Sequence, residues 1–218
     1  MKIKIRGEEL ELLPERALWW PRRRMLMIAD LHAGKDAAFR AAAIPIPHKT
    51  FAEDLERLSL ALRVTGARRL AVLGDLAHHR SGWTEAVRRV LREWRALHPD
   101  VAVTLLRGNH DDHAGDPPPE LEIECRGGAW ELEPFRLAHQ PDATAGYAIA
   151  GHLHPSVTLR RKGTPSISLP CFYFGATYAL LPAFGRFTGT ARIRPKPGER
   201  VFAIAGEEVI EIPTSASR

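Results

Sequence analysis

Met25-Leu26-Met27-Ile28-Ala29-Asp30-Leu31-His32 is the stretch that decides the fold of this chain. An apolar run that ends at an aspartate is typical of a buried strand with a polar side chain at its carboxyl end. Residues 70–73 form a second such run, before Gly74-Asp75, and residues 101–106 form a third, before Arg107-Gly108-Asn109. Open α/β sheets build their sites where the carboxyl ends of parallel strands meet, so these runs predict one shared site.

Two segments with helical spacing separate the three runs. Residues 50–64 and 84–97 place apolar side chains three and four positions apart, with Thr50 as the expected N-cap of the first helix. Strand, helix and strand in succession predict parallel strands joined by crossover helices. After the proline-rich residues 116–119, short strands are expected around 130–138, 147–150, 168–174 and 201–204. The second half should therefore form a mostly β layer that packs against the first.

Composition sets the broad class. With 218 residues, of which 44% are hydrophobic, we expect a single domain spanning residues 1–218. The net charge of +5 suits a polyanionic substrate but is common among unrelated proteins. Cys125 and Cys171 form no CxxC pair, so neither a disulfide framework nor a thiolate zinc site is expected. No secretory signal or 18-residue apolar run is present, so we expect a cytoplasmic protein without a membrane span.

Five clusters of potential metal ligands each follow an apolar run. In chain order they are Asp30-Leu31-His32, Gly74-Asp75, Gly108-Asn109-His110-Asp111, His139 and Gly151-His152-Leu153-His154. Carboxylate, amide and imidazole ligands without thiolates suit divalent manganese, iron or zinc, and two ions with roughly eight protein contacts can be held if one carboxylate bridges them. The glycines before Asp75, Asn109 and His152 are expected to allow tight turns that direct the next side chain into the cleft.

The order of these motifs resembles that of the calcineurin-like metallophosphoesterases. The resemblance implies an α/β sandwich of two mixed β-sheets flanked by α-helices, with a binuclear metal site at the carboxyl ends of the strands. It implies one ion held by Asp30, His32, Asp75 and His154, and a second held by Asp75, Asn109, His139 and His152, with Asp75 as the bridge. It also implies that His110 is a catalytic histidine, hydrogen-bonded to Asp111, that stabilises the transition state or protonates the leaving oxygen.

A narrower resemblance covers nearly the whole chain. Residues 13–18, 30–35, 39–40, 44–47, 107–111 and 181–189 resemble those of the bacterial ligase-associated DNA damage response endonucleases. This likeness implies a manganese-dependent DNA phosphodiesterase or endonuclease that is associated with a repair helicase, an ATP-dependent DNA ligase and a nuclease. Gln140 stands where an acidic residue is expected and Ala33 where leucine is more usual, but neither is a candidate ligand.

Several polar residues near the motifs are candidates for contacts with substrate. Lys35 and Arg40 follow the first motif in an expected loop, and with Arg107 they could hold flanking phosphates. For the loop, an exposed basic surface is an equally good interpretation. His78 and His79 follow Asp75 closely enough to reach the cleft, but they match no ligand motif and are interpreted as surface or core histidines.

The leading functional hypothesis is an enzyme that cuts phosphodiesters in single-stranded or flexible DNA. Two ions about 3.5–4 Å apart would supply a hydroxide for in-line attack on phosphorus, assisted by His110. A second hypothesis keeps this chemistry but has a small nucleotide or a phosphoprotein as the substrate. A third is a scaffold without catalytic activity, which the complete set of ligands and His110 disfavours.

Overall fold

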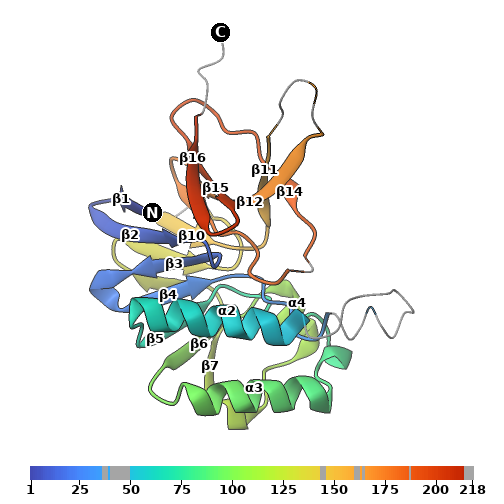
Figure 1. Ribbon diagram of the computed structural model, residues 1–218. Coiled ribbons are helices and arrows are strands. Elements are labelled where there is room, and N and C mark those ends of the chain that lie inside the picture. The colour runs from blue at the N-terminus through green and yellow to red at the C-terminus, as the bar shows by residue number, and fades with distance from the viewer. Residues whose placement is uncertain are drawn as a thin grey trace.

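The computed structural model describes residues 1–35, 39, 50–142, 146–159, 163, 165–186 and 188–213. Their strands form one sheet of seven strands and one of nine, stacked face to face (Figure 1). The two long described helices cover the outer face of the first sheet. The predicted fold class, a sandwich of two mixed sheets with helices, is confirmed.

The first sheet follows chain order, so each strand pairs with its neighbours in sequence. Its strands are β1 (Lys2–Ile5), β2 (Glu8–Leu13), β3 (Ala17–Trp20), β4 (Met25–Ile28), β5 (Arg69–Val72), β6 (Ala102–Leu106) and β7 (Ile123–Arg126). The pairs from β1 to β4 are antiparallel and the pairs from β4 to β7 are parallel. Helices α2 (Thr50–Thr65) and α3 (Glu85–Leu97) provide the two predicted crossovers, and Thr84 caps α3 by accepting a hydrogen bond from the Val87 N–H.

The second sheet combines antiparallel pairs with three parallel pairs, β9 with β10, β10 with β13 and β11 with β14. Its strands are β8 (Trp130–Leu132), β9 (Phe135–Ala138), β10 (Tyr147–Ala150), β11 (Pro155–Leu159), β12 (Ile167–Phe174), β13 (Tyr178–Leu180), β14 (Ala191–Arg192), β15 (Arg200–Ala205) and β16 (Glu208–Ile212). The hairpin of β15 and β16 turns at Gly206.

Side chains of β4 alternate between two apolar clusters, as the pleat of a strand requires. Leu26 and Ile28 pack with the helices, while Met25 and Met27 face the second sheet. All four are fully buried, which explains why residues 25–28 read as a continuous apolar run.

Several elements of the fold differ from the sequence-based expectation. Strands β1 to β3 precede the strand at Met25, the expected strand at 130–138 is the hairpin of β8 and β9, and the motif that starts at Asn109 forms the short helix α4 (Asn109–Ala114). Thr50, the expected N-cap, lies within α2, and the residues just before it are outside the described part of the chain.

Candidate metal centre and active site

The carboxyl ends of strands from both sheets deliver the predicted ligands to one place. Asp30 follows β4, Asp75 follows β5, and Asn109 opens α4 after β6. From the second sheet, His139 follows β9, and His152 and His154 follow β10. Backbone hydrogen bonds join the first two loops, because the Asp30 N–H donates to Gly74 and the His32 N–H donates to Asp75.

The structure gathers six of the seven predicted ligands into two groups. Ligand atoms of Asp30, His32 and His154 lie within 4.8 Å of one another, and so do those of Asp75, His139 and His152. Asn109, the seventh, places its side-chain oxygen 3.1 Å from His139 Nε2. Asp75 lies between the groups, with one carboxylate oxygen 3.9 Å from His32 Nε2 and the other 3.6 Å from His139 Nε2.

Both aspartates carry charge in a place that excludes water. Asp30 is 0% exposed and Asp75 is 2% exposed, and among the described residues no lysine or arginine forms a salt bridge with either. Each accepts a backbone hydrogen bond, Asp30 from the His152 N–H and Asp75 from the His110 N–H. Buried carboxylates that have no salt bridge with a lysine or arginine are unfavourable, so a bound cation would stabilise the site.

Unsatisfied imidazole nitrogens complete the case for metal binding. Both ring nitrogens of His32 are buried without a hydrogen-bond partner. Nε2 of His154 is also buried and lies 3.5 Å from Asp30 Oδ1; burial lowers the pKa of His154, but this contact with Asp30 outweighs it and the pKa is raised. Burial and the nearby Lys35 charge lower the pKa of His32 to about 2, so its ring is neutral near pH 7, which is the form that binds metals. Burial also lowers the pKa of His152. Unpaired nitrogen donors beside buried carboxylates fit divalent cations.

The backbone at the ligands is itself unusual. Asp30, His32, Asp75, His152 and His154 have φ angles of 56°, 51°, 52°, 67° and 46°, in the left-handed region that side chains other than glycine rarely occupy. Each such residue costs on the order of 1–3 kcal/mol, and this kind of strain clusters at functional sites. The bend that turns these side chains inward therefore lies at the ligands themselves.

Of the three glycines before the ligands, only Gly74 has the backbone of the expected tight turn. Gly74 has a φ of +82°, but Gly108 has a φ of −96° and Gly151 does not have a positive φ. What the three share is crowding, because an added Cβ would lie 2.1 Å from His139 Nδ1 at Gly74, 2.3 Å from Asp75 Oδ1 at Gly108 and 2.5 Å from Ala29 Cβ at Gly151. They let the ligand loops approach closely.

The predicted hydrogen bond between His110 and Asp111 is wrong. His110 Nδ1 instead donates to the carbonyl oxygen of His78, at 2.8 Å, so Nε2 is the ring nitrogen that remains for other contacts. Asp111 is 2% exposed and accepts hydrogen bonds from the N–H groups of Ala77 and Gly108. Asp111 therefore holds the Asp75 loop against the start of α4 and does not orient the His110 ring directly.

His78, which was interpreted from the sequence as a surface or core histidine, lies in the site against His32 and His110. Its ring stacks on His110 with centroids 4.9 Å apart and meets the edge of His32 at 5.5 Å. Its Nδ1 is buried without a hydrogen-bond partner, and burial lowers its pKa to about 4. The one signal in the sequence is its place three residues after Asp75.

The three predicted phosphate contacts have different outcomes. Lys35 is half-buried and close enough to Asp30 and Asp75 for their charges to affect its pKa, which burial nevertheless lowers. Arg40 lies outside the described residues. Arg107 is bound to Asp116 through Nε and Nη2, both at 2.7 Å, and lines a cavity of about 490 Å³ that also reaches Asn109 and His139.

The late segment 181–186 supports the first ligand loop. Its Phe184 N–H donates to Ala29 and its Gly185 N–H donates to Asp30. Arg16 donates to the carbonyl of Ala183, and Arg57 donates to that of Phe184 and covers the Phe184 ring at 4.5 Å. Asp54 balances this charge with an oxygen 2.8 Å from Arg57. We refer to Arg16, Asp54 and Arg57 as the arginine clamp.

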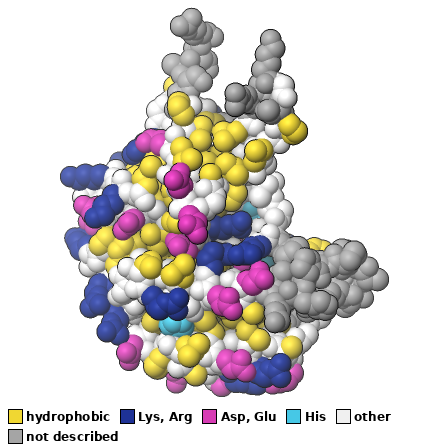
Figure 2. Space-filling model, in the orientation of Figure 1, with side chains coloured by type: hydrophobic (Ala, Val, Ile, Leu, Met, Phe, Trp, Pro, Cys, Tyr) yellow, Lys and Arg dark blue, Asp and Glu magenta, His cyan; other side chains and the backbone are white. Residues whose placement is uncertain are grey.

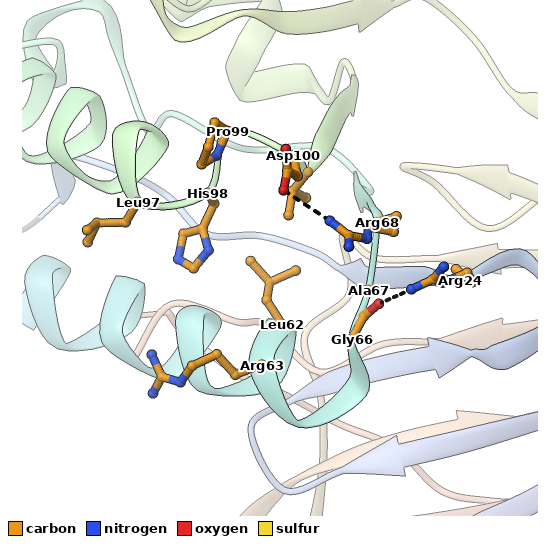
Figure 3. Close-up of a pocket in the computed structure, with 11 residues that line it drawn as sticks. Arg24, Leu62, Arg63, Gly66, Ala67, Arg68, Leu97, His98, Pro99 and Asp100 are labelled. Atoms are coloured by element: carbon orange, nitrogen blue, oxygen red, sulfur yellow. Dashed lines mark hydrogen bonds and ion pairs between the residues drawn. The ribbon is translucent and has the colours of Figure 1, made fainter.

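A second cavity, of about 250 Å³, lies at the amino-terminal ends of β5 and β6, beside the last turns of α2 and α3 (Figure 3). Two of its three arginines are engaged locally, because Arg24 donates to the Gly66 carbonyl and Arg68 pairs with Asp100, while Arg63 is exposed. On the face shown in Figure 2, lysine and arginine side chains are interspersed with acidic ones. The net positive charge therefore does not mark a second site in either place.

Comparison with known proteins identifies the family. Residues 23–168 match the family model described as calcineurin-like phosphoesterase. The chain belongs to this family. Its members use divalent metals to hydrolyse phosphoesters, in agreement with the two ligand groups. Within the described residues, no helix is both long and apolar enough to cross a membrane.

Among solved structures, the nuclease MPE of Pseudomonas putida matches with 37% sequence identity and a TM-score of 0.86, over 97% of this chain and 99% of that one. The phosphoesterase Yfce of E. coli matches with 17% identity and a TM-score of 0.41, over 88% and 99% of the two chains. A protein of unknown function from Aquifex aeolicus matches with 18% identity and a TM-score of 0.41, over 64% and 81%. The last two likenesses are too weak to add to the assignment. No curated protein sequence matches significantly.

Proposed function

We propose that this phosphoesterase is a DNA endonuclease that depends on two divalent ions and acts on single-stranded or flexible DNA. The observation that carries the proposal is the pair of ligand groups around the buried Asp75. Support for a nucleic-acid substrate comes from the 37% identity to a nuclease over nearly the full length of both chains.

Each ion has a set of residues that would hold it. Asp30, His32 and His154 would hold the first and Asn109, His139 and His152 the second, with Asp75 shared between them. When bound, two divalent ions acidify a shared water and neutralise charge on the phosphate oxygens. Manganese is our preferred ion, with iron and zinc as alternatives, because this ligand set accepts all three.

His110 is the protein group best placed to assist the reaction. Its Nδ1–H is committed to the His78 carbonyl, so Nε2 is available to exchange a proton with the substrate. The His110 backbone N–H also donates to Asp75 at 3.0 Å, so its side chain and the shared ligand are held in one arrangement. Groups fixed before the reaction can stabilise developing charge without reorganising.

The cellular setting is the part of the proposal that rests on the narrower sequence resemblance. We place the enzyme in cytoplasmic DNA repair, in association with a helicase, an ATP-dependent DNA ligase and a nuclease. The residues of the 181–189 block that the structure describes form hydrogen bonds that support the Asp30 loop, which connects the block to the catalytic centre.

The first experiment is cleavage of circular single-stranded DNA in Mn²⁺, with bis(4-nitrophenyl) phosphate as a parallel substrate. Nicking of the circle is expected, because a circle has no end for an exonuclease, and Asp75→Ala should abolish both reactions. Hydrolysis of the ester without nicking of the circle would indicate that the substrate is a small nucleotide or a phosphoprotein. Raising the salt concentration should weaken DNA binding steeply but affect the small ester little.

A further inference from the structure

The cavity beside the second ligand group is open to a ligand larger than phosphate. Its lining includes Arg107, Asn109, Asp112, Arg136, His139 and Gln140. We call it the flanking groove, because its lining combines the candidate ligands Asn109 and His139 with residues outside the two ligand groups. Its volume of about 490 Å³ falls in the range of about 300–1,000 Å³ that is typical of small-molecule sites.

The two arginines of the flanking groove are held in fixed orientations. Arg107 contacts both oxygens of Asp116 at 2.7 Å, and these contacts occupy two of its nitrogens, Nε and Nη2. Arg136 lies between Asp142, at 2.5 Å, and Glu131, at 3.0 Å. A guanidinium has five N–H donors, so Arg107 keeps donors beyond those used by its ion pair. A side chain that is already immobilised loses little entropy when it binds a ligand.

The charge of the flanking groove suits a neutral polar ligand. Arg107 and Arg136 are balanced by Asp112 and Asp142, which also line it. Small and apolar surface is contributed by Gly128, Ala129, Ala138 and Pro141. A run of phosphates would find no net positive charge there, whereas a base and its sugar need apolar contact and a few hydrogen-bonding groups.

We propose that the flanking groove binds the nucleoside next to the scissile phosphate. The inference rests on the proposed function, since it assumes a phosphodiester held at the two ligand groups. It adds that the enzyme recognises the nucleoside on the side of Asn109 and His139. The polar side chain of Gln140 lines the same groove, which gives this exposed residue a role in contact with the base.

The test is isothermal titration calorimetry of the full-length protein in Mn²⁺, with thymidine 5′-monophosphate and inorganic phosphate as ligands. Wild type should bind the nucleotide at least about tenfold more tightly than phosphate, a difference of about 1.4 kcal/mol. Ala129→Trp should fill the groove and reduce the ratio of the two affinities, nucleotide over phosphate, to near one without changing the affinity for phosphate. Ala96→Trp, at an exposed position of α3, is the control of equal size and should leave the ratio unchanged.

Gln140→Ala guards against misfolding of the tryptophan variant, because Gln140 is exposed and lies in a loop. It should lower the ratio by about threefold, as expected for one lost hydrogen bond. The assignment of the groove would be overturned if wild type bound the two ligands equally. It would also be overturned if neither Ala129→Trp nor Gln140→Ala changed the affinity for nucleotide relative to phosphate. If the protein cleaves DNA but binds the nucleotide no more tightly than phosphate, the proposed function stands and the groove assignment fails. If the groove variants weaken nucleotide binding but wild type does not cleave DNA, only the proposed nuclease activity is rejected.

Discussion

At the scale of single residues, the candidate centre combines features that are unfavourable until a cation is bound. Asp30 and Asp75 are buried charges without a lysine or arginine salt bridge among the described residues, and both have left-handed backbones. His32 adds two buried nitrogens without hydrogen bonds. A divalent ion would balance the carboxylates and use the nitrogens, so residue-scale variants should separate metal binding from catalysis.

His110 should affect turnover and not metal content. One of its ring nitrogens lies within 4.8 Å of ligand atoms of His32 and His78, but that group has no carboxylate, and His110 belongs to neither of the two groups that contain Asp30 and Asp75. Its contact with Asp75 is through the backbone N–H, which survives in His110→Ala. We expect His110→Ala to lose about 10²-fold or more in kcat, as for a lost general acid or charge stabiliser. Metal analysis by mass spectrometry should show unchanged stoichiometry, and a parallel loss of metal would assign His110 as a ligand.

Gly151→Ala tests whether crowding at the ligand loops matters. The new Cβ would lie 2.5 Å from Ala29 Cβ and 2.8 Å from Asp30 Oδ2, and overpacking of this kind costs about 1–3 kcal/mol. Chemical denaturation should show that loss, together with weaker Mn²⁺ binding. Gly127→Ala is the matched control, because the nearest atom to its Cβ is Arg107 Nη1 at 4.0 Å. Equal stability of the two variants would count against the packing argument.

At the scale of elements, local patterns predicted the strands and helices that are buried on one or both faces. Residues 25–28 and 84–97 were identified correctly because their apolar spacing is set by the layers on either side. The N-terminal strands β1 to β3 were missed, since they are only four to six residues long and β2 mixes glutamates with apolar residues. The hydrogen bond of His110 to His78 was missed because it uses a backbone carbonyl, which leaves no trace in residue type.

The arginine clamp is an element-scale device whose members are distant in sequence. Arg57→Ala removes the donor to the Phe184 carbonyl and leaves Asp54, which is 4% exposed, without its 2.8 Å partner. Asp54 would keep only the backbone N–H of Arg186, at 3.2 Å, and the Arg186 guanidinium, at 3.7 Å. Because this leaves a buried charge poorly compensated, we expect the free energy of unfolding to fall by about 3 kcal/mol. Calorimetric titration should also show weaker Mn²⁺ binding, since segment 181–186, which the clamp holds, donates backbone hydrogen bonds to Ala29 and Asp30.

Arg63→Ala provides the control for the clamp. Arg63 belongs to the same helix but is exposed and forms no ion pair with any described residue. Its loss should change stability by less than about 0.5 kcal/mol. If Arg57→Ala is as mild as Arg63→Ala, the clamp does not support the ligand loop. Arg57→Lys should recover only part of the loss, because lysine lacks the planar fork of N–H donors.

At the scale of the whole molecule, the centre joins the two sheets, because β4 and β5 supply the aspartates and β9 and β10 supply His139, His152 and His154. Metal binding should therefore stabilise the entire sandwich. At a free Mn²⁺ concentration of 100 times the dissociation constant, the expected gain is about 2.7 kcal/mol. For a chain of this size, that gain corresponds to a rise in Tm of roughly 5–10 °C.

Differential scanning calorimetry of the EDTA-treated protein, with and without added Mn²⁺, measures this coupling. A single transition that moves upward with metal would show that both sheets respond together, and two transitions of which one moves would show that the sheets unfold separately. Asp75→Ala should be insensitive to Mn²⁺, because it removes the carboxylate between the two ligand groups. In the absence of metal it should be at least as stable as wild type, since the variant no longer buries that uncompensated charge. A large stabilisation of Asp75→Ala by metal would mean that each group binds its ion independently and that the shared carboxylate is not what links the two sheets.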